Sequence, residues 1–175
     1  MHHLWQLSVA DLTVERVNHF ERPGVLPLSF SLLHFIRGED GVVSIMLLEE
    51  PTLWESGNWR EKVGSNVDAA PRGTPMEVAE SIRFQDMDAW REYQTAVFQR
   101  TEALLAGGAL DWDKEMFGGT LNPAMATSFL GLLVGPEGPA RMIDVIEAFI
   151  YQHGLRHLGE VDHARAVAGL SGVSS

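Results

Sequence analysis

The stretch that decides the fold is residues 143–170, IDVIEAFIYQHGLRHLGEVDHARAVAGL. Apolar residues recur in it at spacings of three and four, which is the pattern of an amphipathic α-helix. His153 and His157 lie on this apolar row, four residues apart. Side chains at that spacing lie one above the other on a helix, so both imidazoles can reach one metal ion. We therefore expect a helix from Ile143 to Leu170 whose two histidines point inward, where they need hydrogen-bond partners or a metal.

A second helix with a histidine is predicted over Leu28–Glu49. One of its faces carries His34, Gly38 and Gly41 in a row. Two glycines inside a helix cost roughly 1 kcal/mol each relative to alanine. We expect the compensation to be the close approach of another helix beside His34, which makes His34 the third candidate metal ligand.

The rest of the chain also has the periodicity of helices, and no segment alternates apolar and polar residues as a half-buried strand does. The remaining predicted helices are Leu4–Val17, in which Ser8 and Asp11 are expected to break or re-cap the helix, a short one from Thr74, Asp86–Leu105 and Asn122–Val134. The expected fold class is all-α, a four-helix bundle with a long connection between the second and third helices. We expect a single domain over residues 1–170 and a flexible tail over residues 171–175.

Composition limits the possible partners. The 175 residues include 24 acidic and 13 basic side chains, with a formal net charge of −11, which argues against nucleic acid or an anionic membrane as a partner. Because the chain has no cysteine, any metal must be held by His, Asp or Glu. The N-terminal residues lack the apolar run of a signal peptide, and no stretch has the length of a membrane span. We expect a cytoplasmic protein.

Three parts of the sequence together resemble the DinB/YfiT-like superfamily. They are LSFSLLHFIRGED (residues 28–40), WESGNW (54–59) and HGLRHLGE (153–160). The resemblance covers most of the chain, from about Asp11 to Gly169. It implies a four-helix bundle that holds a divalent metal, nickel or zinc, with three histidines, here His34, His153 and His157. It also implies a low-molecular-weight thiol as cosubstrate in a transfer or isomerisation reaction.

Three functions of different classes fit such a site. The first is a metal-dependent thiol transferase or isomerase acting on a small molecule, in which the thiol must come from a cosubstrate because the chain has none. The second is a metal-dependent hydrolase that uses bound water at the same histidines. The third is a non-catalytic bundle that keeps the histidines as a structural or ligand-sensing site.

The other titratable residues near the motif are weaker candidates. Glu160, three residues after His157, is a candidate hydrogen-bond partner of that ligand or a proton acceptor. A solvated glutamate, or one in a salt bridge to Arg156 or Arg37, is an equally good interpretation. The histidines interpreted as lying outside the site are His2 and His3 at a mobile terminus, His19 in a loop, and His163 on another helix face.

The expected assembly follows from the first helix. Members of the family usually begin with a longer first helix, whereas ten residues precede Asp11 here. A short first helix leaves apolar surface of its neighbours uncovered, and closed two-fold pairing is the commonest way to bury it. We expect a homodimer with Met1–Val17 at or near the interface. The alternative is that Thr52–Arg83 folds back over the gap within one chain.

Overall fold

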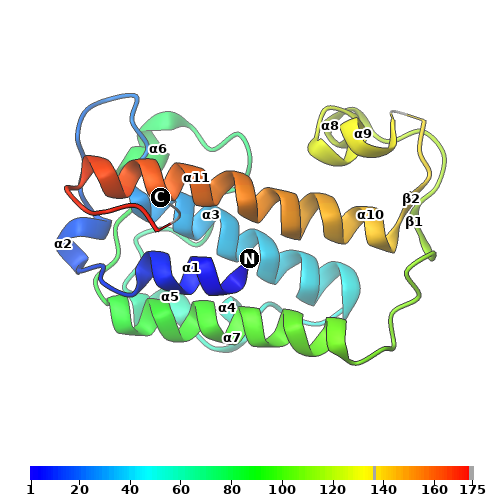
Figure 1. Ribbon diagram of the computed structural model, residues 1–175, viewed down its shortest axis with the longest axis horizontal. Coiled ribbons are helices and arrows are strands. Elements are labelled where there is room, and N and C mark those ends of the chain that lie inside the picture. Colours follow the sequence, from blue (N-terminus) through cyan, green and yellow to red (C-terminus); the bar gives the residue numbers. More distant parts are fainter. Residues whose placement is uncertain (136, 174–175) are drawn as a thin grey trace.

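Three long helical segments lie side by side in the computed structural model, which describes residues 1–135 and 137–173 (Figure 1). They are α3 (Leu28–Gly41) with its π-helical continuation η1 (Val42–Leu47), α7 (Met87–Ala106), and the run of α10 (Met142–Ile146), π-helical η2 (Glu147–Tyr151) and α11 (Gln152–Val167). The three long helices predicted from the sequence are thus confirmed to within a few residues at their ends. The all-α class is confirmed as well.

The predicted first helix is divided into two. α1 (His2–Val9) packs against α7 and α11. α2 (Val14–Val17) is capped by Thr13, whose side chain accepts a hydrogen bond from the Arg16 backbone N–H. Trp5 of α1 is completely buried and its indole N–H donates to the Gly154 carbonyl of α11. α1 runs along only part of the length of its two neighbours (Figure 1).

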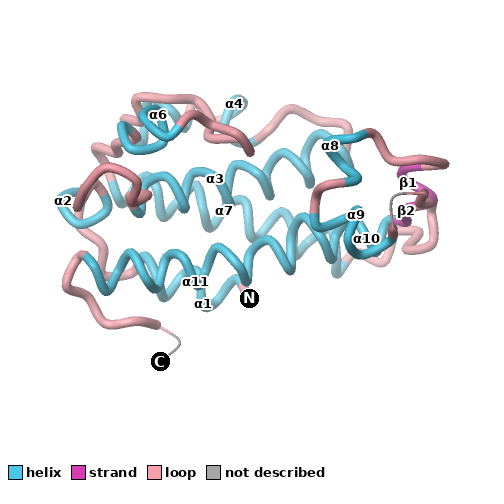
Figure 2. Tube along the Cα trace, turned by 90° about the horizontal axis from the view of Figure 1, so that it is seen from above, coloured by secondary structure: helices cyan, strands magenta, loops and turns pink. Residues whose placement is uncertain are grey.

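The long connection between the second and third long helices contains α4 (Leu53–Ser56), α5 (Trp59–Val63) and α6 (Met76–Ser81). Its α4 and α5 pack against α7, with Trp54 and Val63 buried. Figure 2 shows α4 and α6 on the side of α3 and α7 opposite to α1. The alternative to a dimer, in which Thr52–Arg83 covers the gap beside the short first helix, stays a prediction.

One end of the molecule departs from the prediction. The single helix expected over Asn122–Val134 is instead two short ones, α8 (Pro123–Ala126) and α9 (Phe129–Val134). They lie in the connection between two short strands, β1 (Glu115–Phe117) and β2 (Ala140–Arg141), which pair antiparallel. No strand was expected, because strands of three and two residues are too short to show alternation. α9 packs on η2 around a small second core formed by Leu130, Ala140, Val145 and Ala148.

The C-terminal residues lie against α11 as far as they are described. The Arg165 side chain donates to the Ser171 carbonyl, and the Val173 backbone N–H donates to Asp162. Residues 174–175 of the predicted flexible tail are outside the described residues. Within 1–135 and 137–173, no helix combines the length and the apolar character needed to cross a bilayer.

Candidate metal centre

Three imidazole rings from two helices meet between α3 and α11. His34 extends from α3, and His153 and His157 extend from successive turns of α11. The Nε2 atom of His153 is 3.2 Å from that of His34 and 2.9 Å from that of His157. One ligand atom from each residue lies within 4.8 Å of the other two, so the group could hold a metal ion. The structure thus brings together the three residues singled out in the sequence.

Glycines let the two helices approach at this point. A Cβ added to Gly38 would lie 3.6 Å from the His153 ring, so the ring packs directly over the glycine, as expected beside His34. A Cβ added to Gly154 would come within 2.8 Å of the Phe35 ring, which alanine could not do without displacing that ring. Gly41 differs, because nothing lies within 4 Å of its added Cβ. The expectation of a close approach is therefore wrong for Gly41.

The outer nitrogens of the rings are held by hydrogen bonds. His34 Nδ1 bonds to the Ala70 carbonyl at 2.5 Å, and His157 Nδ1 bonds to Glu160 at 2.6 Å. The His153 ring bonds to the backbone of Phe149, one turn earlier. A carbonyl or a carboxylate accepts only, so the bonds of His34 and His157 place their protons on Nδ1. This leaves the Nε2 lone pairs of His34 and His157 directed at Nε2 of His153, an arrangement that a cation between the three atoms would stabilise.

The environment keeps two of the rings neutral. Burial, followed by the charge of His157, lowers the pKa of His34. Burial, followed by the charges of His157, His34 and Arg156, lowers the pKa of His153 to about 3. Neutral imidazole is the form that binds a metal. Both residues are therefore in the metal-binding form over the whole neutral range.

Glu160 is bonded to the site. The hydrogen bond from His157 is the main cause that lowers the pKa of Glu160. Its ion-pair partner among the described residues is His157, rather than Arg156 or Arg37. A carboxylate that accepts the outer N–H of a ligand histidine fixes the ring orientation and raises its basicity. The same bond makes Glu160 a weaker base than an ordinary glutamate.

Two cavities reach the imidazoles. The larger, of about 510 Å³, is lined by all three histidines and Glu160 together with Arg72, Arg156 and the apolar side chains of Phe129, Leu132, Ala148 and Phe149. The smaller, of about 280 Å³, is lined by His34, His153, Arg37, Gly38 and the segment 69–72. Their volumes suit small organic molecules. A ligand can therefore approach the three Nε2 atoms from solvent.

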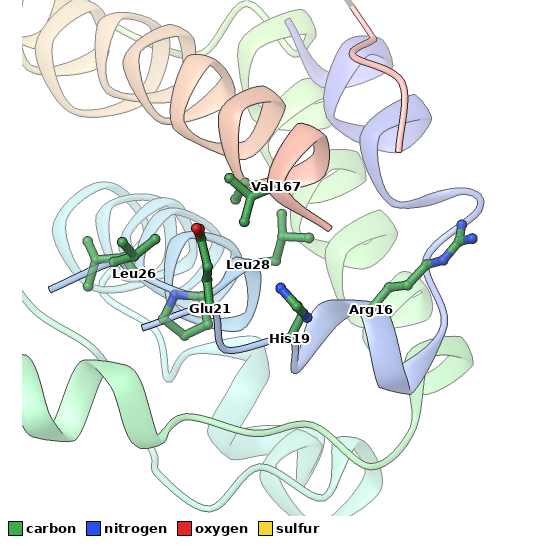
Figure 3. A pocket seen from close by; sticks show the side chains of 9 residues that line it. Arg16, His19, Glu21, Leu26, Leu28 and Val167 are labelled. Atoms are coloured by element: carbon green, nitrogen blue, oxygen red, sulfur yellow. The ribbon is translucent and has the colours of Figure 1, made fainter. Parts of the chain in front are cut away.

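A third pocket, at the far end of α11, is too small for such a ligand. Figure 3 shows it between the segment that leads into α3, with His19 and Leu26, and Val167 of α11. Its volume of about 10 Å³ has room for no more than one water molecule. His19 lines this small pocket and neither of the two cavities that reach the imidazoles.

His2 corrects one sequence interpretation. Its side chain is only 11% exposed, stacks on the Phe98 ring and bonds to Glu39 and Glu102. Burial lowers the pKa of His2, but the hydrogen bonds and charges of Glu39 and Glu102 outweigh it and raise the pKa. The prediction of a mobile terminus at His2 is therefore wrong. His163 is exposed on α11, as expected for a residue outside the metal cluster.

Sequence reasoning gave no place at the site to Arg72 or the Ala70 carbonyl, and it named Arg156 only as a possible salt-bridge partner of Glu160. Arg156 directly precedes His157, and consecutive residues on a helix point about 100° apart, so the sequence placed Arg156 at the side of the histidine face. Arg72 and Ala70 lie in an irregular part of the connection between α5 and α6. No periodicity marks a loop residue, so neither had a signal of this kind.

Comparisons with known proteins relate the chain to solved structures. No protein-family model matches the chain, and neither does any curated protein. Among solved structures, the chain is similar to the crystal structure of the conserved protein of locus from Enterococcus faecalis, with a TM-score of 0.64 and 17% sequence identity, over 95% of this chain and 89% of that one. At this identity the likeness supports the fold alone.

Proposed function

We propose that this chain is a divalent-metal-dependent enzyme of the DinB/YfiT-like type, in which α1, α3, α7 and α11 form a four-helix bundle. The proposed reaction is a thiol-dependent transfer or isomerisation on a small molecule. The observation that carries the proposal is the convergence of three Nε2 atoms beside an open cavity. Imidazole nitrogens suit nickel and zinc, which are the metals we propose.

In this proposal the three histidines bind the metal, and the other residues that line the cavity contact the substrate. His34, His153 and His157 would hold the ion, and a divalent ion there supplies a Lewis acid that favours the thiolate form of a bound thiol. The thiol comes from a small molecule because the chain has no cysteine. Phe129, Leu132 and Phe149 line the cavity with apolar surface against which the apolar part of a substrate can pack.

Glu160 acts in this proposal by positioning His157. Its carboxylate bonds to Nδ1 of that ring at 2.6 Å, and its lowered pKa disfavours the uptake of a proton at neutral pH. This supports the first of the two roles considered for Glu160 from the sequence. The role of proton acceptor requires a base with a pKa closer to neutrality.

The experiment that tests the proposal adds thiols to the metal-loaded protein. Mycothiol, bacillithiol and glutathione are each supplied with a panel of small electrophiles, and consumption of the thiol is followed. Turnover that requires both metal and thiol, and that is lost in His153→Ala but kept in His163→Ala, is the expected result. Turnover with metal and no thiol would instead indicate the hydrolase. Bound metal without turnover under either condition would indicate a non-catalytic metal-binding protein.

A further inference from the structure

The larger cavity at the histidines has an excess of positive side chains. Arg72 enters its lining from the connection between α5 and α6, and Arg156 enters from α11. Among the described residues that line it, Glu160 is the acidic one, and it is bonded to His157. This is unusual for a chain of net charge −11. The local excess of positive charge therefore needs a reason specific to this cavity.

Both guanidinium groups keep hydrogen-bond donors that the described residues do not engage. Arg156 lies over the Phe129 ring at 4.8 Å and donates to the Gln152 carbonyl at 3.3 Å. Arg72 donates to the Ala124 carbonyl, at the long distance of 3.4 Å. A guanidinium has five N–H donors, so a single bond to a carbonyl leaves most of them available. Both side chains are exposed at the cavity and can bond to a ligand.

The ring under Arg156 also fixes its position. The cation–π contact with Phe129 restrains the Arg156 guanidinium beside the cavity, which reduces the entropy lost when a ligand binds. Phe129 and Leu132 belong to α9, so the same short helix supplies apolar cavity wall beside the charge. A ligand with an apolar body and one anionic end matches this combination.

We propose that Arg72 and Arg156 bind the carboxylate of the small molecule whose other end reaches the three histidines. This inference rests on the proposed function, because it describes the ligand of the same site. The planar fork of arginine pairs with a carboxylate through two parallel hydrogen bonds, which gives orientation as well as affinity. The substrate class is therefore a small organic acid, with its carboxylate at the arginines and its reactive group at the histidines.

The test compares two probes that differ only in charge. Cobalt-loaded protein is titrated with 3-mercaptopropionate and with 3-mercaptopropanamide, and with their longer homologues, and the thiolate-to-cobalt absorption band reports binding. For at least one chain length the acid should bind about tenfold to a hundredfold more tightly than the amide, the range of one to two charge-assisted hydrogen bonds. If no thiolate band forms, the same acid and amide pairs are compared by calorimetry.

Three variants locate the source of the preference. Arg72→Gln and Arg156→Gln should each reduce the acid-to-amide ratio by about tenfold while leaving the affinity for the amide unchanged. Arg22→Gln, on an exposed residue that lines neither histidine cavity, is the matched control and should keep the full ratio.

Equal affinities for acid and amide in the metal-loaded protein would overturn this inference and leave the metal proposal intact. A preference that persists in the double variant Arg72→Gln/Arg156→Gln would also overturn it, because the metal alone would then attract the acid. Failure of the wild-type protein to bind cobalt is a different result, and it contradicts the proposed function itself.

Discussion

Replacing Asp40 by alanine should destabilise the fold more than any surface substitution. Asp40 is 1% exposed, and its carboxylate accepts four hydrogen bonds. The donors are the Ser44 hydroxyl at 2.8 Å, the backbone N–H groups of Leu53 and Trp54 at 3.0 Å, and the Tyr93 hydroxyl at 2.9 Å. The four bonds tie α3 to the start of α4 and to α7, and they use the full acceptor capacity of the two oxygens.

The magnitude follows from what the substitution leaves behind. Asp40→Ala leaves several buried donors without an acceptor, at about 1–3 kcal/mol for each, and these costs are not additive within one network. The removal of one partner from a buried charged network typically costs about 3–5 kcal/mol. We expect a loss of about 4 kcal/mol in the free energy of unfolding. Asp40→Asn keeps one acceptor oxygen and should lose roughly half as much.

Urea denaturation followed by tryptophan fluorescence measures this loss. Asp113→Ala is the matched control, because that side chain is 84% exposed and pairs with Arg141 at the surface, and such pairs contribute about 0–1 kcal/mol. A loss below about 1 kcal/mol for Asp40→Ala, similar to the control, would refute the reasoning that this carboxylate joins the three helices.

Three further predictions concern the site and the assembly. Glu160→Gln keeps an acceptor for His157 but removes the charge, so metal affinity in competition with a chelator should fall about tenfold; unchanged affinity would reject the positioning role. The urea midpoint of metal-free protein should fall as the pH drops from 6.5 towards 4, because His34 and His153 take up protons more readily in the unfolded chain than in the fold, which lowers the pKa of both. His153→Ala should weaken this pH dependence, and an equal dependence in both proteins would contradict the prediction. Sedimentation should show a homodimer, since α1 runs along only part of its neighbours and η1 and η2 expose the apolar side chains of Ile45 and Tyr151. A single species near 19.4 kDa would reject the dimer.

The helices and the three histidines could be predicted because they depend on local periodicity. The spacing of His153 and His157 within an apolar row determines both the helix and the side of the helix on which the rings lie. His34 required a further inference, namely that the glycines in its row allow another helix to approach. In the structure the His153 ring packs over Gly38 of that row. Each of these inferences uses residues of a single helix, and a sequence shows such relations directly.

The rest of the site depends on contacts between distant segments. The Ala70 carbonyl and Arg72 reach the cavity only because the connection folds against α3, and nothing in their own neighbourhood encodes that approach. Asp40 was not singled out either, since an acidic residue late in a helix usually faces water. His2 was interpreted as mobile because its partners, Glu39 and Glu102, lie far along the chain.

Metal analysis of untagged protein tests the central claim most directly. Elemental analysis should find one divalent ion per chain, nickel or zinc, in the wild-type protein. The ion should be lost in His34→Ala, His153→Ala and His157→Ala, while circular dichroism shows that each variant keeps its helices. The control His163→Ala, on an exposed residue of the same helix, should keep the ion. Full metal content in His34→Ala, or no metal in the wild-type protein after incubation with nickel or zinc, would contradict the account.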